Sequence, residues 1–286
     1  MLQTIDLNDP RSRHHYMVAM RVLHELPAFD WYDSHFLAKF EAARRMLEIV
    51  NPHRVDAFVG AFASLRTDPG FEVRHVREIC DPARFGDLLA QVGAVPKQRL
   101  KSYENAEFGR SILHDLPVLD ALQRELTPLV SQLAGETVVP CYNFLSLYHG
   151  GGRCPPHMDA PSAKWTLDLC LAQSCEWPIL FSKVVPWPIS GKPPVLPQGA
   201  GVSMPDLAFR DHVLHPNEAL LFSGSSQWHY RDAIPDGGFC HLAFLHYHPA
   251  GCADLVAPAR WAERFDLPEL AVLDAVFDAV RPAARS

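Results

Sequence analysis

Apolar residues recur every three or four positions in three segments of the chain, 34–50, 119–133 and 268–280. This spacing places the apolar side chains on one face of a helix, so we expect three amphipathic helices that pack against a core. Ser34 is expected to cap the first helix, which the pair Asn51-Pro52 should end.

From about residue 138 the pattern changes to short runs rich in Val, Phe, Leu, Tyr and Trp, separated by Pro, Gly and Ser. We expect the strands to be 141–148, 164–171, 179–185, 218–223 and 240–248, with shorter ones near 156–159 and 206–210. Many short strands at this interval are typical of a sandwich or a jelly roll.

The run 164–171 alternates between two kinds of side chain. Its odd positions are Trp and Leu, whereas its even positions are Lys164, Thr166, Asp168 and Cys170. Successive side chains of a strand point to opposite faces, so this pattern predicts one buried face and one solvated face.

Composition limits the kinds of partner. The formal net charge is −7, so the chain has no surplus of basic residues with which to bind nucleic acid or an anionic membrane. Charged residues interrupt the first thirty positions, and no apolar run approaches the roughly 20 residues of a membrane span. The seven cysteines form no CxxC pair. These features favour a soluble protein of the reducing cytoplasm.

The candidate chemistry lies in the β-rich half. His157 and Asp159 stand two residues apart, so on an extended strand both side chains point to one side and can bind one metal ion. His229 lies seventy residues after Asp159, just beyond another expected strand. Two imidazoles and one carboxylate suit non-haem Fe(II) and leave coordination positions open for substrate and oxygen.

In these features the sequence resembles the 2-oxoglutarate/Fe(II)-dependent oxygenase superfamily. The resemblance rests on His157-x-Asp159, the tyrosine-ending strand before it, the apolar strand 164–171 after it, and the approach to His229 over 214–222. The run His229-Tyr230-Arg231-Asp232 resembles bacterial members. The match is good over 120–250, loose over 66–120 and almost absent over 1–65.

The resemblance implies an α+β protein. Its core would be a double-stranded β-helix, the cupin-like jelly-roll barrel, with flanking helices. We expect a helical N-terminal extension over 1–65, the oxygenase core over 66–258 and a C-terminal helix over 259–286. The Pro- and Gly-rich stretch 186–205 is expected to form a long loop that closes over the site.

The resemblance also implies that His157, Asp159 and His229 bind iron, with 2-oxoglutarate as cosubstrate. One departure affects the cosubstrate. Most members carry Arg or Lys about ten residues beyond the distal histidine to pair with the far carboxylate, but here that window is Gly-Gly-Phe-Cys-His over 237–241. The candidate replacements are Tyr148, Arg231 and His241, then Lys164, with Arg153 as a further possibility.

The activity implied is hydroxylation of an unactivated C–H bond in a small molecule, an amino-acid derivative or a peptide. Oxygen is consumed, and succinate and carbon dioxide are the coproducts. Two alternatives stay open, a cupin-like metal-binding module without redox catalysis and an Fe(II) dioxygenase that does not use 2-oxoglutarate. Three roles stay open for residues 1–65: capping the barrel, shaping the substrate entrance, or forming the contact of a homodimer.

Overall fold

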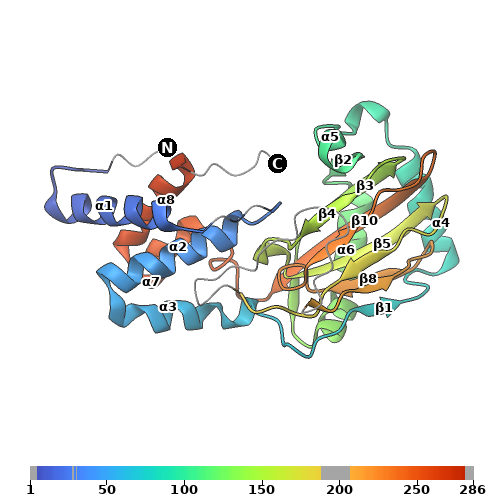
Figure 1. Ribbon diagram of the computed structural model, residues 1–286. Coiled ribbons are helices and arrows are strands. Elements are labelled where there is room, and N and C mark those ends of the chain that lie inside the picture. Colours follow the sequence, from blue (N-terminus) through green and yellow to red (C-terminus); the bar gives the residue numbers. More distant parts are fainter. Residues whose placement is uncertain (1–4, 28, 30, 188–206, 281–286) are drawn as a thin grey trace. The chain divides into compact units, whose positions relative to one another are not determined.

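The computed structural model describes residues 5–27, 29, 31–187 and 207–280. The chain divides into two compact units (Figure 1). The first comprises residues 1–66, 186–196 and 251–286, and the second comprises 67–185 and 197–250. The domain boundaries expected at 65/66 and 258/259 stay a prediction. From residue 188 onward, the expected closing loop 186–205 lies outside the described residues.

The first unit is helical in its described part. Its α-helices are α1 Pro10–Glu25, α2 His35–Val50, α3 Val55–Ala61, α7 Trp261–Phe265 and α8 Pro268–Val280. Helices α2 and α8 occupy the segments predicted from periodicity, whereas α1 and α3 lie within the expected helical extension 1–65 but were not located individually. Ser34 does not cap α2 with its side chain as expected, because its hydroxyl donates to the carbonyl of Phe29 at 2.7 Å.

Aromatic rings fill the core of this helical unit. Phe40 of α2 contacts Phe58 and Phe62 at ring-centroid distances of 5.6 and 4.9 Å, and Trp261 contacts Phe62 at 5.2 Å. One buried cation joins two of the helices, since Lys39 pairs with both Asp274 and Asp278 of α8 at 2.7 Å.

The second unit contains the strands and three further helices. The strands are β1 Arg74–Val76, β2 Arg110–His114, β3 Val138–His149, β4 Cys154–His157, β5 Trp165–Gln173, β6 Ile179–Phe181, β7 Arg210–His212, β8 Ala219–Phe222, β9 His229–Arg231 and β10 Phe239–Pro249. The helices are α4 Pro82–Gly93, α5 Asn105–Phe108 and α6 Pro117–Ala134. The combination of helices with antiparallel strands confirms the coarse α+β prediction.

Among the described residues the strands form two antiparallel sheets. The first has the order β1-β8-β5-β10-β3-β2 and the second β4-β9-β6-β7. From β3 to β10 the chain passes repeatedly between the two sheets, so strands distant in sequence become neighbours. In this way β9 pairs with β4, about seventy residues earlier in the chain.

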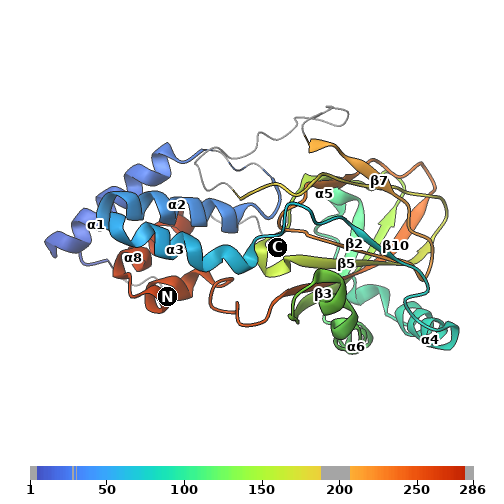
Figure 2. The same cartoon turned by 90° about the horizontal axis from the view of Figure 1, so that it is seen from below.

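One face of the first sheet packs on an apolar core. The odd residues of β5, including Leu167 and Leu169, pack in one apolar cluster with residues of α4 and α6. Figure 2 shows α4 and α6 on the same side of this sheet. We call this side of the first sheet its outer face and the opposite side its inner face. The inner face is not solvated as predicted from the alternation, because Thr166, Asp168 and Cys170 are also buried.

The inner face is buried because it faces the second sheet. Phe222 of β8 contacts Phe181 of β6 at 4.6 Å between ring centroids, and Asp168 of β5 pairs with Arg231 of β9.

All seven cysteines are free thiols. In the described part of the chain, no helix combines the length and the apolar character needed to cross a membrane.

Candidate metal centre

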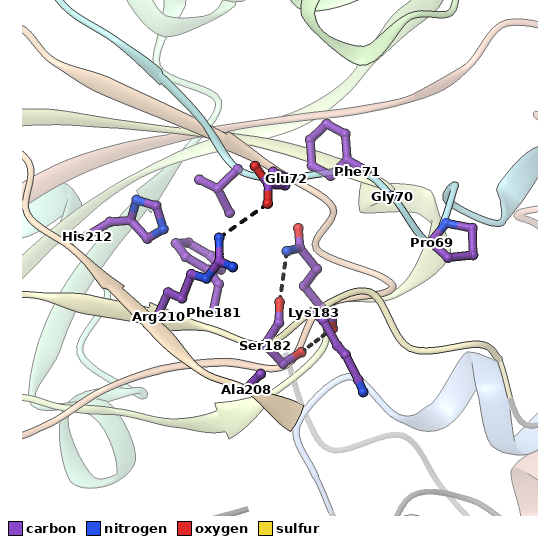
Figure 3. A pocket seen from close by; sticks show the side chains of 12 residues that line it. Pro69, Gly70, Phe71, Glu72, Phe181, Ser182, Lys183, Ala208, Arg210 and His212 are labelled. Carbon is purple, nitrogen blue, oxygen red and sulfur yellow. Dashed lines mark hydrogen bonds and ion pairs between the residues drawn. The ribbon is translucent and has the colours of Figure 1, made fainter. Parts of the chain in front are cut away.

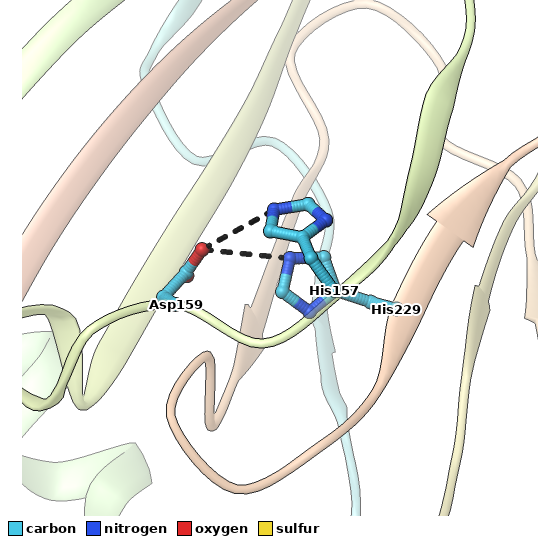
Figure 4. Close-up of side chains that lie close together, drawn as sticks. All are labelled: His157, Asp159 and His229. Carbon is cyan, nitrogen blue, oxygen red and sulfur yellow. Dashed lines mark ion pairs between the residues drawn. The ribbon is translucent and has the colours of Figure 1, made fainter. Parts of the chain in front are cut away.

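Two neighbouring strands of the second sheet bring the predicted ligands together. His157 is the last residue of β4 and His229 is the first of β9, and these two residues are direct partners in the register. Asp159 follows β4 by two residues. Figure 4 shows both imidazoles approaching the same carboxylate oxygen.

The three ligand groups lie close enough to bind one ion. The Nε2 atoms of His157 and His229 are each 3.6 Å from Oδ1 of Asp159. The candidate ligand atoms all lie within 4.8 Å of one another. The three residues retain only 8%, 8% and 4% of their exposed surface, which provides the partly dehydrated site that a tightly bound metal requires.

Backbone carbonyls orient both imidazoles. The Nδ1 atom of His157 lies 2.9 Å from the carbonyl of Pro155, and that of His229 lies 3.0 Å from the carbonyl of Gln227. A carbonyl can only accept, so each Nδ1 carries a proton and each Nε2 faces the common point, where it can bind a metal once it carries no proton. This donor set fits a divalent transition metal such as Fe(II).

The carboxylate is positioned by contacts of its own. The Asp159 amide donates to the carbonyl of Gly224 at 2.8 Å, and its Oδ2 accepts from the hydroxyl of Thr166 at 2.9 Å. A Cβ atom at Gly224 would lie 2.0 Å from Oδ2, so only glycine leaves room for the carboxylate in this position.

Burial by itself would raise the pKa of Asp159. The imidazoles of His229 and His157 outweigh burial and hold this pKa well below its usual range, so Asp159 is ionised. Burial likewise opposes protonation of His157, but the nearby Cys154 thiol and Asp159 raise its pKa well above the ordinary value. The site therefore offers a localised negative charge with two imidazoles around it.

Two of the five candidate cosubstrate residues lie between the sheets, near the triad. Arg231 shares the interior side of β9 with His229, donates to Asp168 at 2.7 Å, and retains 3% of its exposed surface. Tyr148 on the inner face of β3 accepts from Arg110 at 2.7 Å. Burial raises the pKa of Tyr148 against the effect of Arg110, so its hydroxyl stays neutral.

The other three candidates have different surroundings. Lys164 pairs with Glu136 at 2.5 Å. His241 follows Cys240 on β10 and shares the outer face with Ala243, which packs in the apolar cluster with α6. Arg153 is exposed in the turn between β3 and β4. The structure therefore brings Tyr148 and Arg231 together with the triad but not Lys164, His241 or Arg153.

Sequence reasoning missed three residues around the site. Arg110 of β2 is buried and pairs with Glu104 at 2.5 Å, and Thr166 and His246 connect to Asp159 through hydrogen bonds. Thr166 carried a signal, since it stands among the polar positions of an alternating strand, but those positions were assigned to solvent. Arg110 lies in a segment where the family resemblance is loose.

Figure 3 shows a pocket of about 220 Å³ whose lining includes residues of β6 and β7. Phe181 and Gln227 line it, and these residues also contact His229 through its ring and its Nδ1. Arg210 and Glu72 form an exposed ion pair at 3.2 Å in its lining. The pocket therefore reaches the residues that support one metal ligand.

No protein-family model matches the sequence, and no curated protein matches it either. Several solved structures match in fold. SnoK, a non-heme alpha ketoglutarate dependent carbocyclase from nogalamycin biosynthesis, has a TM-score of 0.50 at 10% identity, over 65% of this chain and 83% of that one.

Two other solved structures match with a slightly lower TM-score. The epimerase SnoN, also from nogalamycin biosynthesis, has a TM-score of 0.49 at 13% identity, over 70% of this chain and 82% of its own. HygX from Streptomyces hygroscopicus was solved with nickel, 2-oxoglutarate and hygromycin B bound. It has a TM-score of 0.49 at 9% sequence identity, over 68% of this chain and 86% of its own. The likeness to SnoK shows a shared fold.

Proposed function

We propose that this chain is an Fe(II)- and 2-oxoglutarate-dependent oxygenase whose iron is bound by His157, Asp159 and His229. The observation that carries the proposal is the convergence of these groups, with both Nδ1 atoms directed to backbone carbonyls and both Nε2 atoms directed to one carboxylate. The description of SnoK as alpha ketoglutarate dependent supports the same assignment.

The fold that we propose for the second unit is a jelly-roll barrel. Its support is the strand order, in which β3, β5, β8 and β10 belong to one sheet and β4, β6, β7 and β9 to the other. Such alternation along the chain is the connectivity of a double-stranded β-helix. This arrangement places the ends of β4 and β9 side by side, where the ligands lie.

In this mechanism the chain positions and shields the reacting groups. Bound iron supplies the oxidising chemistry, coupled to conversion of 2-oxoglutarate to succinate and carbon dioxide, at coordination positions that three protein ligands leave open. Thr166 and the amide of Asp159 keep the carboxylate in place, and the two carbonyls fix the imidazole planes. Burial of all three ligands limits access of water.

For the cosubstrate we propose Tyr148 and Arg231 as the residues that bind the far carboxylate. Arg231 lies two residues beyond His229 on the same strand face, about 7 Å along the strand, which is within the reach of a five-carbon diacid. Tyr148 contributes a neutral hydroxyl beside the buried cation Arg110. A carboxylate buried without such partners would be strongly disfavoured.

The reaction that we propose is hydroxylation of an unactivated C–H bond of a small molecule, an amino-acid derivative or a peptide. The test is an anaerobic titration of the Fe(II) protein with 2-oxoglutarate. Chelation by the cosubstrate is expected to produce a weak visible charge-transfer band, and admission of oxygen is expected to release succinate. If neither the band nor succinate appeared, the remaining explanations would be a metal-binding module and an Fe(II) dioxygenase that does not use 2-oxoglutarate.

Variants separate the roles within this titration. His157→Ala and Asp159→Ala are expected to lose bound iron, whereas the exposed His149→Ala is expected to retain it. Arg231→Met and Tyr148→Phe are expected to keep iron. They should need a higher concentration of 2-oxoglutarate to reach half of the maximal intensity of the charge-transfer band. Unchanged iron content in His157→Ala would remove the site assignment.

A further inference from the structure

Aromatic side chains gather on the inner face of the first sheet, next to the proposed metal site. Tyr142 and Phe144 come from β3, and Phe244 and His246 come from the neighbouring strand β10. Phe144 and Phe244 are direct partners in the register. The first three rings are only half-buried, whereas Leu145, Ala243 and Leu245 on the opposite face of the same strands are fully buried in the apolar cluster.

The four rings have nearly the same orientation. Tyr142 and Phe144 stack on His246 at centroid distances of 4.2 and 5.6 Å, with interplanar angles of 29° and 21°. Phe144 and Phe244 lie 5.0 Å apart at 31°. We call this group the aromatic platform. Aligned and partly exposed aromatic rings favour contact with another flat ring.

The platform is connected to the metal site by one hydroxyl. Thr166 donates its proton to Oδ2 of Asp159, and its oxygen lies 3.0 Å from Nδ1 of His246. Because that hydroxyl has only one proton, Nδ1 of His246 must donate to it. A ring bound on the platform would therefore lie close to the proposed iron.

His246 then presents an unused acceptor. Burial lowers its pKa to about 4, so the imidazole is neutral and its second nitrogen, Nε2, carries a lone pair. This atom is buried and has no hydrogen-bond partner among the described residues, and the whole side chain retains 3% of its exposed surface. A buried acceptor without a donor is unfavourable, which points to a ligand that supplies one.

We propose that the aromatic platform binds the primary substrate, and that this substrate is a planar aromatic molecule whose O–H or N–H group donates to Nε2 of His246. The proposal rests on the proposed function and specifies its substrate class. Phenols and N–H heteroaromatic rings have this chemistry.

The nearby charges argue against a cationic ligand. Aromatic clusters also bind ammonium groups, but the guanidinium of Arg110 already lies 5.3 Å from the centre of the Phe144 ring. A second cation at the platform would be repelled by it, whereas a neutral ring with one donor would not. His246 as an acceptor also selects for a donor group on the ligand.

The experiment measures binding of two probes to the full-length protein, with and without anaerobic Fe(II). 2-Naphthol has the ring and the donor, and naphthalene has only the ring. We expect naphthol to bind at least about fivefold more tightly, the effect of one added hydrogen bond. Phe144→Ala and Phe244→Ala are expected to weaken both probes.

His246→Asn is the decisive variant. Its amide can still donate toward Thr166 but lacks a group at the position of Nε2, so the two probes should bind equally, both more weakly than naphthalene binds the unaltered protein because one platform ring is lost. His246→Gln places an amide oxygen near that position and should keep part of the preference. His149→Asn, the same change at an exposed site, should leave both constants unchanged.

Equal binding of the two probes to the unaltered protein would overturn the proposal, as would an unchanged preference in His246→Asn. Tight binding of an ammonium compound in place of naphthol would also contradict it. Failure of the proposed function would differ, because the 2-oxoglutarate band would then be absent while the preference for naphthol persisted.

Discussion

Gly224 is the residue at the metal centre whose size is most constrained, because a Cβ atom there would lie 2.0 Å from Oδ2 of Asp159. We predict that Gly224→Ala displaces this carboxylate and weakens Fe(II) binding by about 10- to 100-fold, as is typical when the support of a metal ligand is lost. Isothermal titration calorimetry with Fe(II) measures the change in the dissociation constant.

Gly93→Ala is the matched control for this prediction, since a Cβ atom at Gly93 meets nothing within 4 Å. That variant should bind Fe(II) as the unaltered chain does. Full metal affinity in Gly224→Ala would show that Asp159 does not need its present position.

His246 also predicts how stability responds to acid. Its pKa is lowered to about 4 in the folded protein by burial, against 6.5 in an unfolded chain, so below pH 6.5 the unfolded state binds the extra proton. The free energy of unfolding is therefore not reduced by His246 above pH 6.5, and it decreases as the pH falls from 6.5 toward 4. Between pH 7 and 5 the loss is about 2 kcal/mol.

Urea unfolding at these two pH values measures that loss. Carboxylates contribute as well, so the quantity of interest is the difference between the unaltered protein and His246→Asn. The variant should lose about 2 kcal/mol less on acidification. An identical pH dependence for both proteins would contradict a buried neutral imidazole.

At the scale of elements, one ion pair joins the two sheets through β5 and β9. Arg231 and Asp168 retain 3% and 0% of their exposed surface, and burial raises the pKa of Asp168 even though Arg231 opposes that rise. We predict that Arg231→Met lowers the free energy of unfolding by about 3–5 kcal/mol, because it leaves a buried carboxyl group without its partner.

A double-mutant cycle tests this explanation. Asp168→Leu combined with Arg231→Met should cost less than the sum of the two single changes, since neither charge is then left alone. Arg210→Met breaks the exposed pair with Glu72 and should cost less than about 1 kcal/mol. Additive effects at Arg231 and Asp168 would show that their pairing does not stabilise the contact between the sheets.

At the scale of the whole molecule, the metal ligands all belong to the second of the two compact units. A metal that binds only the folded state stabilises the unit that contains its ligands, by about 2.7 kcal/mol at a concentration one hundred times the dissociation constant. We therefore predict that removing metal with a chelator increases hydrogen exchange in β4, β5 and β9 far more than in α2 and α8.

The His157→Ala variant is the control for the exchange measurement, because its exchange should not respond to the chelator. If α2 and α8 responded as strongly as the strands, the two units would unfold as one cooperative body, and the assignment of the linkage to the second unit would be wrong.

Local patterns predicted the elements that are long enough to repeat a pattern of apolar and polar residues. The periodicity of α2, α6 and α8 and the alternation of β5 are examples, because they depend on residues two to four positions apart. The short strands β2 and β9 were missed, since three to five residues contain too little repetition to be recognised.

The identities of the three metal ligands were readable in the chain, because His-x-Asp shares one side of a strand and a distal histidine follows a family-like approach. Their meeting depends on β9 pairing with β4 across about seventy residues, a long-range contact that no local pattern encodes. The same holds for Asp168, whose partner Arg231 comes from the other sheet, and for His246, which reaches Asp159 through Thr166. Residue chemistry and local periodicity are properties of the chain, whereas the surroundings of each side chain arise from the packing of one sheet against another.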